Sequence, residues 1–345
     1  MGVPAGLTIR EITELGAATQ LLQAWDALWK QCPHATTFSR PQWLLSWVEV
    51  FQPERPRILV IENDTALLGI VPFLIYRDGE DRVLGLMGGG ISDYLDILVS
   101  PLSEEIVMAA IAEWVEEHKH EWDRIYLSDL HERSLLLRQR TDRLMRCDEH
   151  DICPVLDIRQ VTGIDQLASS KTMHNLRTAR ARTKRAGGGE VEIADHASLD
   201  PMLNDLFRLH TLRWKGDGHS GGVLDTDQLR TFHCKVTPAL LDEGVLRLYG
   251  LRHQGQIIAS LYALFEKTTV FCYLQGYDPT FGFLSPGTQI LAAVIEDAIG
   301  ERRDQIDLLR GRESYKYLWG AKDTPTRRLV NETATEKTRR GTRAA

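Results

Sequence analysis

The sequence predicts an α+β protein made of two similar units, each a mixed β-sheet flanked by helices. Its 345 residues exceed what one hydrophobic core usually organises. Segments 57–76 and 246–265 share a pattern of strand, short turn and longer strand, and each precedes a strand, a helix and a strand. We therefore expect an N-terminal unit over 1–160, a C-terminal unit over 161–331 and a disordered polar tail at 332–345.

Hydrophobic spacing predicts the elements of the first unit in order. Apolar residues at helical intervals alternate with short runs of β-branched and aromatic residues. Proline suits the first turn of a helix, so one helix is expected to begin at Pro41. The other expected helices cover about 19–32, 103–119 and 133–144, and the expected strands cover 57–61, 66–76, 83–87, 94–99 and 124–128.

The second unit repeats this order after a very basic helix. The order of strands and helices, β-β-β-α-β, is neither that of a solenoid nor that of a Rossmann repeat, and it favours mixed sheets. The expected helices cover about 171–185, 198–215, 227–243 and 286–299, and the expected strands cover 155–158, 190–194, 246–252, 256–265, 269–276, 306–309 and 327–330.

Composition excludes several classes of protein. No run of about 18 apolar residues is present, so no membrane span is expected. Five cysteines without CxxC spacing predict neither a disulfide framework nor a zinc site, and we expect no metal. The first thirty residues have no apolar signal segment. A cytoplasmic protein is therefore expected.

The charge is distributed unevenly along the chain. The formal net charge is −7, from 41 basic and 48 acidic residues. Residues 1–160 hold 15 basic and 26 acidic residues, a net charge of −11, which leaves +4 for residues 161–345. We therefore expect an anionic ligand to bind the second unit.

Five segments together resemble the acyl-CoA N-acyltransferase (GNAT) superfamily. Within it, they are similar to the tandem branch that holds the BioF2-like/CelD-type acetyltransferases and the Fem-type peptidyltransferases. The resemblance implies two tandem GNAT-like units and transfer of an acyl or aminoacyl group to an amine, from acyl-CoA or from an aminoacyl-tRNA. The segments are TFSRPQWLLSWVEVF (37–51), GGGISDYLDILV (88–99), LFRLHTLRWKGDG (206–218), YLQGYDPTFGFLSPGTQILAAVIEDAI (273–299) and LLRGRESYKYLWGAKD (308–323).

The helix start at Ser285, Gly287 and Thr288 is the expected cofactor-binding element. A serine cap, a proline and a glycine give a helix N-terminus whose free N–H groups and dipole bind phosphate. The resemblance implies that this end receives the pyrophosphate of coenzyme A. The alternative is an ordinary capped helix without a ligand.

The segment from Arg310 to Gly320 follows a strand, where open α/β sheets place ligands. The resemblance implies that Lys316 faces the reacting carbonyl, where it stabilises the oxyanion or holds phosphate. Tyr315 is a candidate acid for the leaving thiolate, Glu313 a candidate base for the amine, and Arg310 a candidate for binding the cofactor. The alternative is a surface loop with solvated charges.

Expected substrate-binding residues include Ser92, Asp93 and Tyr94, after three glycines at 88–90. Glycines allow a ligand to approach the backbone closely, and Asp93 is a candidate to bind an ammonium group. The alternative is a glycine turn in which Ser92 and Asp93 make local hydrogen bonds.

A second set of substrate-binding candidates is His210, Arg213 and Trp214, on the expected helix at 198–215. His210 is either a general base or a structural hydrogen-bonding residue. Arg213, followed by Trp214 and a glycine-rich loop, is a candidate to bind an anion.

The basic helix at 171–185 places Arg177, Arg180 and Lys184 on one face. Such a stripe suits phosphate groups, so tRNA, coenzyme A and a nucleotide-linked sugar are all possible partners. The alternative is a solvated surface, and the absence of interleaved aromatics argues against stacking on single strands.

Together these features predict an N-acyltransferase that uses acyl-CoA as co-substrate. The acceptor is expected to be an amine of an amino sugar, a polysaccharide precursor or a peptide, attacking directly without a covalent enzyme intermediate. Two alternatives stay open: a Fem-type aminoacyl-tRNA-dependent transferase, and a non-catalytic accessory protein in envelope polysaccharide synthesis. The sequence leaves the oligomeric state open.

Overall fold

The computed structural model describes residues 6–138, 145–216, 224 and 226–331, except for the side chains of 214–216. Contacts within the chain group residues 1–151 and 325–345 as unit 1, and residues 152–324 as unit 2. Unit 1 therefore includes the last described strand. The expected tail at 332–345 and part of the expected helix at 133–144 lie outside the described residues.

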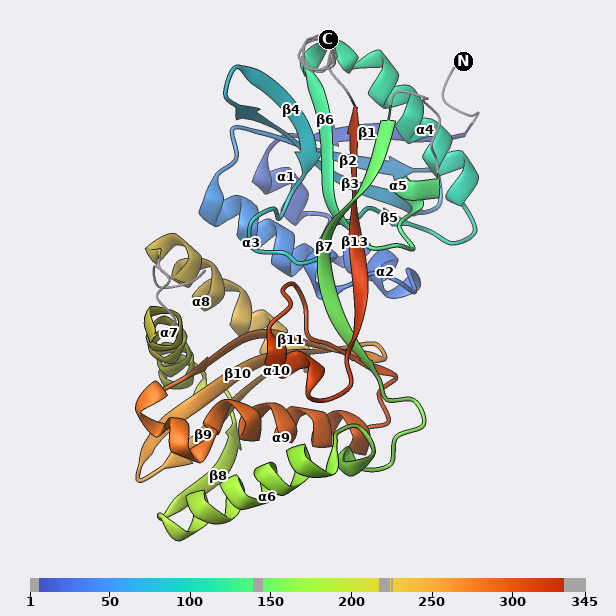
Figure 1. Ribbon diagram of the computed structural model, residues 1–345. Coiled ribbons are helices and arrows are strands. Elements are labelled where there is room, and N and C mark those ends of the chain that lie inside the picture. Colours follow the sequence, from blue (N-terminus) through green and yellow to red (C-terminus); the bar gives the residue numbers. More distant parts are fainter. Residues whose placement is uncertain (1–5, 139–144, 217–223, 225, 332–345) are drawn as a thin grey trace, which may run out of the picture. The chain divides into compact units, whose positions relative to one another are not determined.

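The sheet of unit 1 is mixed (Figure 1). Its strands are β1 (Thr8–Ile12), β2 (Arg55–Glu62), β3 (Leu67–Asp78), β4 (Asp81–Leu86), β5 (Leu98–Val99), β6 (Arg124–Leu130) and β13 (Lys322–Asn331). They lie in the order β1-β2-β3-β4-β6-β13, and β5 pairs with β3. Neighbouring strands are antiparallel except β4 and β6, which run parallel.

Helices cover the sheet of unit 1 and close its core. Val107 and Trp114 of the helix after β5 are buried in a cluster with strand residues, and the Trp114 ring stacks on Phe73 of β3 at 5.8 Å between centroids. The helical elements are α1 (Leu15–Thr19), α2 (Leu22–Gln31), η1 (Thr37–Ser39), α3 (Pro41–Phe51), α4 (Glu104–Glu117), η2 (Lys119–Glu121) and α5 (Leu135–Arg138).

Unit 2 has a mixed sheet of the same pattern. Its strands are β7 (Met145–Asp157, in unit 2 from Ile152), β8 (Gly188–Ile193), β9 (Leu246–His253), β10 (Gln256–Glu266), β11 (Thr269–Tyr277) and β12 (Gln305–Asp307). They lie in the order β8-β9-β10-β11-β12-β7. Only the pair of β11 and β12 is parallel.

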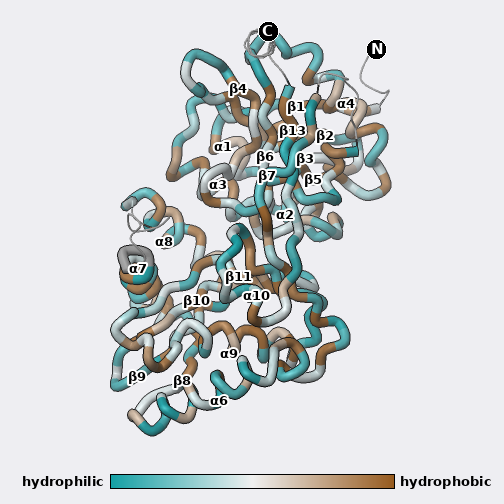
Figure 2. Tube along the Cα trace, viewed as in Figure 1, coloured by the Kyte–Doolittle hydropathy of each residue, from teal (hydrophilic) through white to brown (hydrophobic). Residues whose placement is uncertain are grey.

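Helices α6 (Ser170–Arg185) and α9 (Pro286–Gly300) of unit 2 lie side by side on its sheet (Figure 1). The helical elements are η3 (Ile164–Gln166), α6 (Ser170–Arg185), α7 (Leu199–Gly216), α8 (Asp227–Asp242), η4 (Pro279–Leu284), α9 (Pro286–Gly300) and α10 (Ser314–Tyr317). Apolar residues prevail along α9, whereas hydrophilic ones prevail along α6 (Figure 2). Met173 and Leu176 of α6 join Ile290 and Val294 of α9 in one buried core with β10.

The two units repeat one order of elements, as the sequence predicted. In each, three antiparallel strands precede a helix, and the strand after that helix runs parallel to the third. The predicted α+β class with mixed sheets is therefore confirmed.

Two predicted strands differ from the structure. The expected strand at 94–99 is limited to Leu98–Val99, although Tyr94 and Leu95 are buried, because hydrophobicity predicts burial and not backbone pairing. The expected strand at 155–158 is the end of the much longer β7, whose polar first half gave no apolar pattern.

Candidate active site

The candidate active site of unit 2 begins where β11 and β12 separate. They pair over only three residues, ending at Phe271 and Asp307, while β11 continues to Tyr277. After β12 the chain follows β7, because the Leu308 N–H donates to the carbonyl of Pro154 at 2.9 Å. The second half of β11 therefore continues beyond its pairing with β12.

A β-bulge re-aims the side chains of β11 beside this separation. Tyr262 pairs with Leu274 and Ala263 with Cys272, so Tyr273 is the extra residue. Beyond the bulge, Gly276 faces α7, where an added Cβ would lie 2.3 Å from the His210 nitrogen. Tyr277 points to the other face, towards α9.

The start of α9 lies against the re-aimed residues of β11. The Gln275 side-chain amide donates to the Gly287 carbonyl at 2.8 Å. An added Cβ at Gly287 would lie 3.2 Å from the Tyr277 ring. Gly287 and Thr288 occupy the first turn, where a helix leaves N–H groups available to anions, but the Thr288 N–H donates to the Ser285 carbonyl at 3.1 Å.

The prediction that Ser285 caps α9 through its side chain is wrong. Ser285 adopts a left-handed conformation, with φ 51° and ψ 51°, and makes no side-chain cap hydrogen bond. A capping serine needs an extended backbone to direct its hydroxyl at the first-turn N–H groups. Instead, the Ser285 carbonyl accepts the N–H groups of Thr288 at 3.1 Å and Gln289 at 3.2 Å, and its side chain is exposed.

A cation of α6 lies beside the segment that leads into α9. The Arg182 guanidinium donates to the Phe283 carbonyl. Arg182 is itself exposed, so it can still bind an anion at this point. Sequence analysis placed Arg182 in the basic helix but gave no reason to connect it with α9, because that contact joins residues 101 positions apart.

The rest of the basic helix is partly neutralised. Arg180 makes a bidentate ion pair with Glu296 of α9, with both N–O distances at 2.8 Å. Arg177 and Lys184 of the predicted stripe are exposed. Two of the three cations on that face are therefore available to a phosphate-bearing partner.

Arg213 connects α7 with β11 and α10. Its guanidinium donates to the Gln275 carbonyl at 3.2 Å, and its Cζ lies 5.6 Å from the Tyr277 ring centroid and 5.2 Å from that of Tyr315. Burial raises the pKa of Tyr315 to about 12, and Arg213 opposes this shift. Tyr315 therefore keeps its proton at neutral pH and is able to donate it.

Lys316 is buried in a ring of backbone carbonyls. Its Nζ donates to the carbonyls of Leu309 at 2.9 Å, Arg310 at 2.7 Å and Gly311 at 3.1 Å. The Glu313 carboxylate lies 3.0 Å from the same nitrogen. These acceptors engage all three ammonium protons, so Lys316 fixes the path of the chain after β12 and keeps Glu313 beside it.

That path contains a strained residue at the end of β12. Leu309 has φ 57°, which a branched side chain rarely adopts, and its N–H donates to the buried Asp307 carboxylate at 2.8 Å. Arg310 follows, half-buried. The strain directs the 310–316 segment away from the strand direction.

His210 lies on the buried side of α7, with 2% of its surface exposed. Burial lowers its pKa to about 4, helped by the nearby charge of Arg213. The imidazole is therefore neutral at pH 7 and a weak base. The side chain of Trp214 lies outside the described residues.

Ser92, Asp93 and Tyr94 belong to unit 1 and are buried there. The Ser92 hydroxyl accepts a hydrogen bond from the Trp43 indole at 3.0 Å, and the Tyr94 ring packs against His131 at 5.5 Å. Two of these three candidates thus have clear packing roles.

The structure brings together several predicted residues with two that sequence reasoning missed. Arg213, Tyr315 and Gly287 meet at Gln275 and Tyr277, which were not chosen. The sequence signal that could have indicated Gln275 and Tyr277 is their position between a predicted strand and a predicted helix start. Within the described ranges, no group of three His, Cys, Asp or Glu side chains is placed to hold a metal ion, and no helix there is long and apolar enough to span a membrane.

Comparison with known structures identifies the fold. FemX aligns over 93% of this chain and 96% of its own, with a TM-score of 0.66 and 12% identity. The C-terminal domain of a putative lysylphosphatidylglycerol synthetase from Agrobacterium fabrum aligns over 93% and 94%, with a TM-score of 0.59 and 11% identity. L-PGS from Bacillus licheniformis gives 91% and 94%, a TM-score of 0.58 and 12% identity.

These likenesses show the fold alone. In sequence, residues 170–317 match the model of the acetyltransferase (GNAT) domain. Unit 2 is therefore similar to a GNAT acetyltransferase domain, as the sequence predicted. Among curated proteins, none matches its sequence.

Proposed function

We propose that the protein is an N-acyltransferase that uses acyl-CoA and holds it at unit 2. The separation of β11 from β12 beside the start of α9 carries this proposal. An extended arm with amide groups would add to β11 beyond its pairing with β12, as peptides add to a sheet edge. Gly287 lets Tyr277 and Gln275 pack close to this helix start, since an added Cβ would lie 3.2 Å from the Tyr277 ring and 3.3 Å from the Gln275 amide nitrogen.

The phosphate groups of the donor would lie at the first turn of α9. The N–H group of Gly287 and the helix dipole favour negative charge there. Arg182 adds a full positive charge at the segment before the helix. Ser285 and Arg310 remain candidates for binding the donor at the two sides of this start.

In the proposed reaction a neutral amine attacks the thioester carbonyl, a C–N bond forms and the C–S bond breaks. Glu313 accepts the proton of the amine, and Tyr315 donates a proton to the leaving thiolate. Lys316 stabilises the oxyanion if it releases one of its three carbonyls, and otherwise holds Glu313 in place.

The proposed acceptor is an amine of an amino sugar, a polysaccharide precursor or a peptide. Unit 1 supports a cationic acceptor, since residues 1–151 and 325–345 together hold 20 basic and 27 acidic residues, a net charge of −7. Ser92, Asp93, Tyr94 and the α7 residues His210, Arg213 and Trp214 stay candidates for positioning it. A cytoplasmic location fits a protein that uses acyl-CoA.

A second candidate is an aminoacyl-tRNA-dependent transferase of the Fem type. The full-length structural likeness to FemX and the exposed cations Arg177 and Lys184 favour it. Nucleic-acid binding through these cations would weaken steeply with salt.

Binding of acetyl-CoA tests the first candidate. We expect acetyl-CoA to raise the melting temperature of the full chain, because a ligand that binds only the folded state stabilises it by mass action. Arg182→Gln removes one charge-assisted contact and should weaken binding roughly tenfold. Calorimetric titration measures this change.

Arg177→Gln is the matched control, since it removes the same charge from the exposed side of the same helix. It should leave the affinity for acetyl-CoA within about twofold. Equal losses in both variants would contradict a defined pyrophosphate site. Absence of any effect of acetyl-CoA, together with salt-sensitive binding of charged tRNA, would favour the second candidate.

A further inference from the structure

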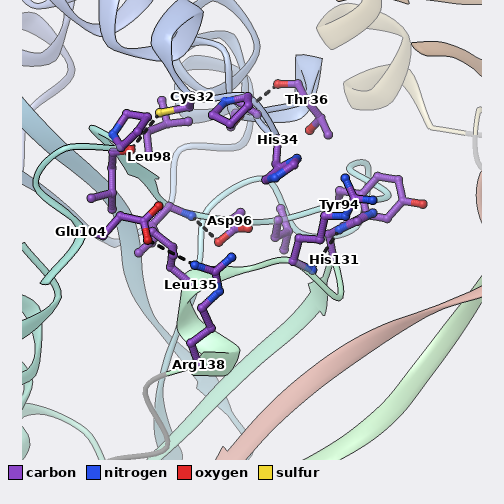
Figure 3. A pocket seen from close by; sticks show the side chains of 18 residues that line it. Cys32, His34, Thr36, Tyr94, Asp96, Leu98, Glu104, His131, Leu135 and Arg138 are labelled. Carbon is purple, nitrogen blue, oxygen red and sulfur yellow. Dashed lines mark hydrogen bonds and ion pairs between the residues drawn. The ribbon is translucent and has the colours of Figure 1, made fainter. Parts of the chain in front are cut away.

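A cavity of about 110 Å³ lies within unit 1, and none of its lining residues belongs to the proposed acyl-donor site (Figure 3). Its walls come from the loop after α2, the coil before β5, the start of α4, and the loop and helix after β6. The GNAT model covers only 170–317 and assigns the cavity no role, and of the lining residues only Tyr94 is a candidate in the proposed reaction.

Asp96 is the acid at the centre of this cavity (Figure 3). One carboxylate oxygen, Oδ1, accepts hydrogen bonds from the Ser134 hydroxyl at 2.7 Å and from the Ile97 N–H at 2.8 Å. Among the described residues, no group donates to the second oxygen, Oδ2. The carboxylate is thus fixed in orientation, and one acceptor is left for a ligand.

Among the described wall residues, no cation is paired with this carboxylate. The Arg138 guanidinium pairs instead with Glu104 at 3.2 Å, and Arg133 is exposed. Burial raises the pKa of Asp96 to about 7, although both hydrogen bonds to Oδ1 oppose that shift. The cavity therefore holds an acid that a positive ligand would ionise.

The neighbouring histidines do not supply that charge. The Nδ1 atom of His131 accepts the Arg133 N–H at 3.1 Å, and burial lowers the pKa of this imidazole. His34 is exposed on the loop after α2, and the thiol of Cys32 on the same loop donates to the Val99 carbonyl at 3.2 Å.

We propose that this cavity binds a small primary alkylammonium group, with the Asp96 carboxylate as its counter-ion. Pro33, Leu98 and Leu135 give apolar walls for the alkyl part. At the roughly 30 Å³ that a water occupies, the volume holds about four heavy atoms. The site takes the end of an amine chain and excludes a bulky head group.

The proposal does not rest on the transferase activity, because binding is measured without an acyl donor. The probe is n-butylamine, which is charged at both pH values used and of whose five heavy atoms about four would lie in the cavity. Because the ammonium binds only the ionised acid, the dissociation constant should rise about tenfold from pH 8 to pH 6. Chemical-shift titration of the full chain measures it, with n-butanol and butyrate as uncharged and anionic probes of equal length.

Asp96→Asn is the decisive variant. An amide oxygen still accepts from Ser134 and Ile97, so the fold is retained, but the counter-ion is lost. We expect binding to weaken at least tenfold and its dependence on pH to disappear. Ala35→Leu, which fills part of the wall, should also weaken binding while Asp96 stays ionisable.

Glu105→Gln is the matched control, since Glu105 is an exposed acid of α4 that does not line the cavity. It should leave the affinity unchanged. Equal binding of butylamine and butanol, equal loss in Glu105→Gln and Asp96→Asn, or no shift of residues 94–99 with butylamine at pH 8 would each overturn the proposal.

Discussion

His210 and His233 are neutral imidazoles held inside unit 2 by α7 and α8. They are 2% and 1% exposed, and the His233 ring meets Tyr262 edge-on at 5.8 Å. Burial lowers their pKa values to about 4 and about 3, with Arg213 adding to the shift of His210 and His210 to that of His233. Of the two roles expected for His210, this environment favours the structural one.

These shifts predict a loss of stability in mild acid. The folded pKa of His210 lies below the unfolded value near 6.5, so the unfolded state binds more protons between about pH 6.5 and 4. The contribution of His210 is fully present above pH 6.5 and is lost as the pH falls through 4. Loss of this contribution should lower the free energy of unfolding by roughly 2 kcal/mol between pH 7 and pH 4.5.

Urea unfolding at pH 7, 5.5 and 4.5 measures this slope. His210→Gln removes the titrating group, so its unfolding free energy should depend less on pH than that of the parent chain. His196→Gln is the control, because His196 is exposed on the same unit. The same slope in all three proteins would show that the buried imidazole does not titrate as inferred.

At the scale of elements, local sequence patterns predicted most of the helices and strands. The basic helix expected at 171–185 is Ser170–Arg185, and the helix expected at 286–299 is Pro286–Gly300, since apolar spacing and the proline at the first turn are local signals. The bulge at Tyr273 and the early end of β12 had no such signal, because both depend on which strands pair. For the same reason Gln275 was missed.

Gly276 permits the close approach of α7 to β11. A Cβ there would lie 2.3 Å from the His210 nitrogen and 2.5 Å from the Leu209 carbonyl carbon, both backbone atoms that move only with the helix. Gly276→Ala should therefore lower the unfolding free energy by about 1–3 kcal/mol. It should also weaken acetyl-CoA binding, since Arg213 of α7 would shift from Gln275.

Gly300→Ala is the matched control, because nothing lies within 4 Å of an added Cβ there. Its unfolding free energy in urea should equal or slightly exceed that of the parent. If Gly276→Ala were equally stable, the contact between α7 and β11 would be looser than this packing implies.

At the scale of the molecule, the two repeated α+β units are not simply consecutive in the sequence, because unit 1 takes its last strand from residues that follow unit 2. The chain enters unit 2 within β7 and returns to unit 1 at Pro325. There β13 pairs with β6, and Leu329 is buried in the core of unit 1. Unit 1 is thus completed by residues that follow unit 2 in the sequence, so its folding requires the end of the chain.

Removal of residues 325–345 should therefore destabilise unit 1 selectively. It deletes the neighbour of β6, the side chain of Leu329 and the Thr326 hydroxyl that accepts the Asp151 N–H at 3.0 Å. Losing a buried leucine alone costs about 2–5 kcal/mol. Hydrogen exchange should show the amides of β6 losing protection by at least about thirtyfold.

A chain ending at Asn331 keeps all of β13 and is the control, with exchange in β6 expected to match the full-length protein. Amides of β9 in unit 2 report within the same experiment and should keep their protection, because their partners β8 and β10 are retained. Equal loss in β6 and β9 would mean that the two units unfold as one. Unchanged exchange in β6 would mean that unit 1 is stable without its last strand, against the burial of Leu329.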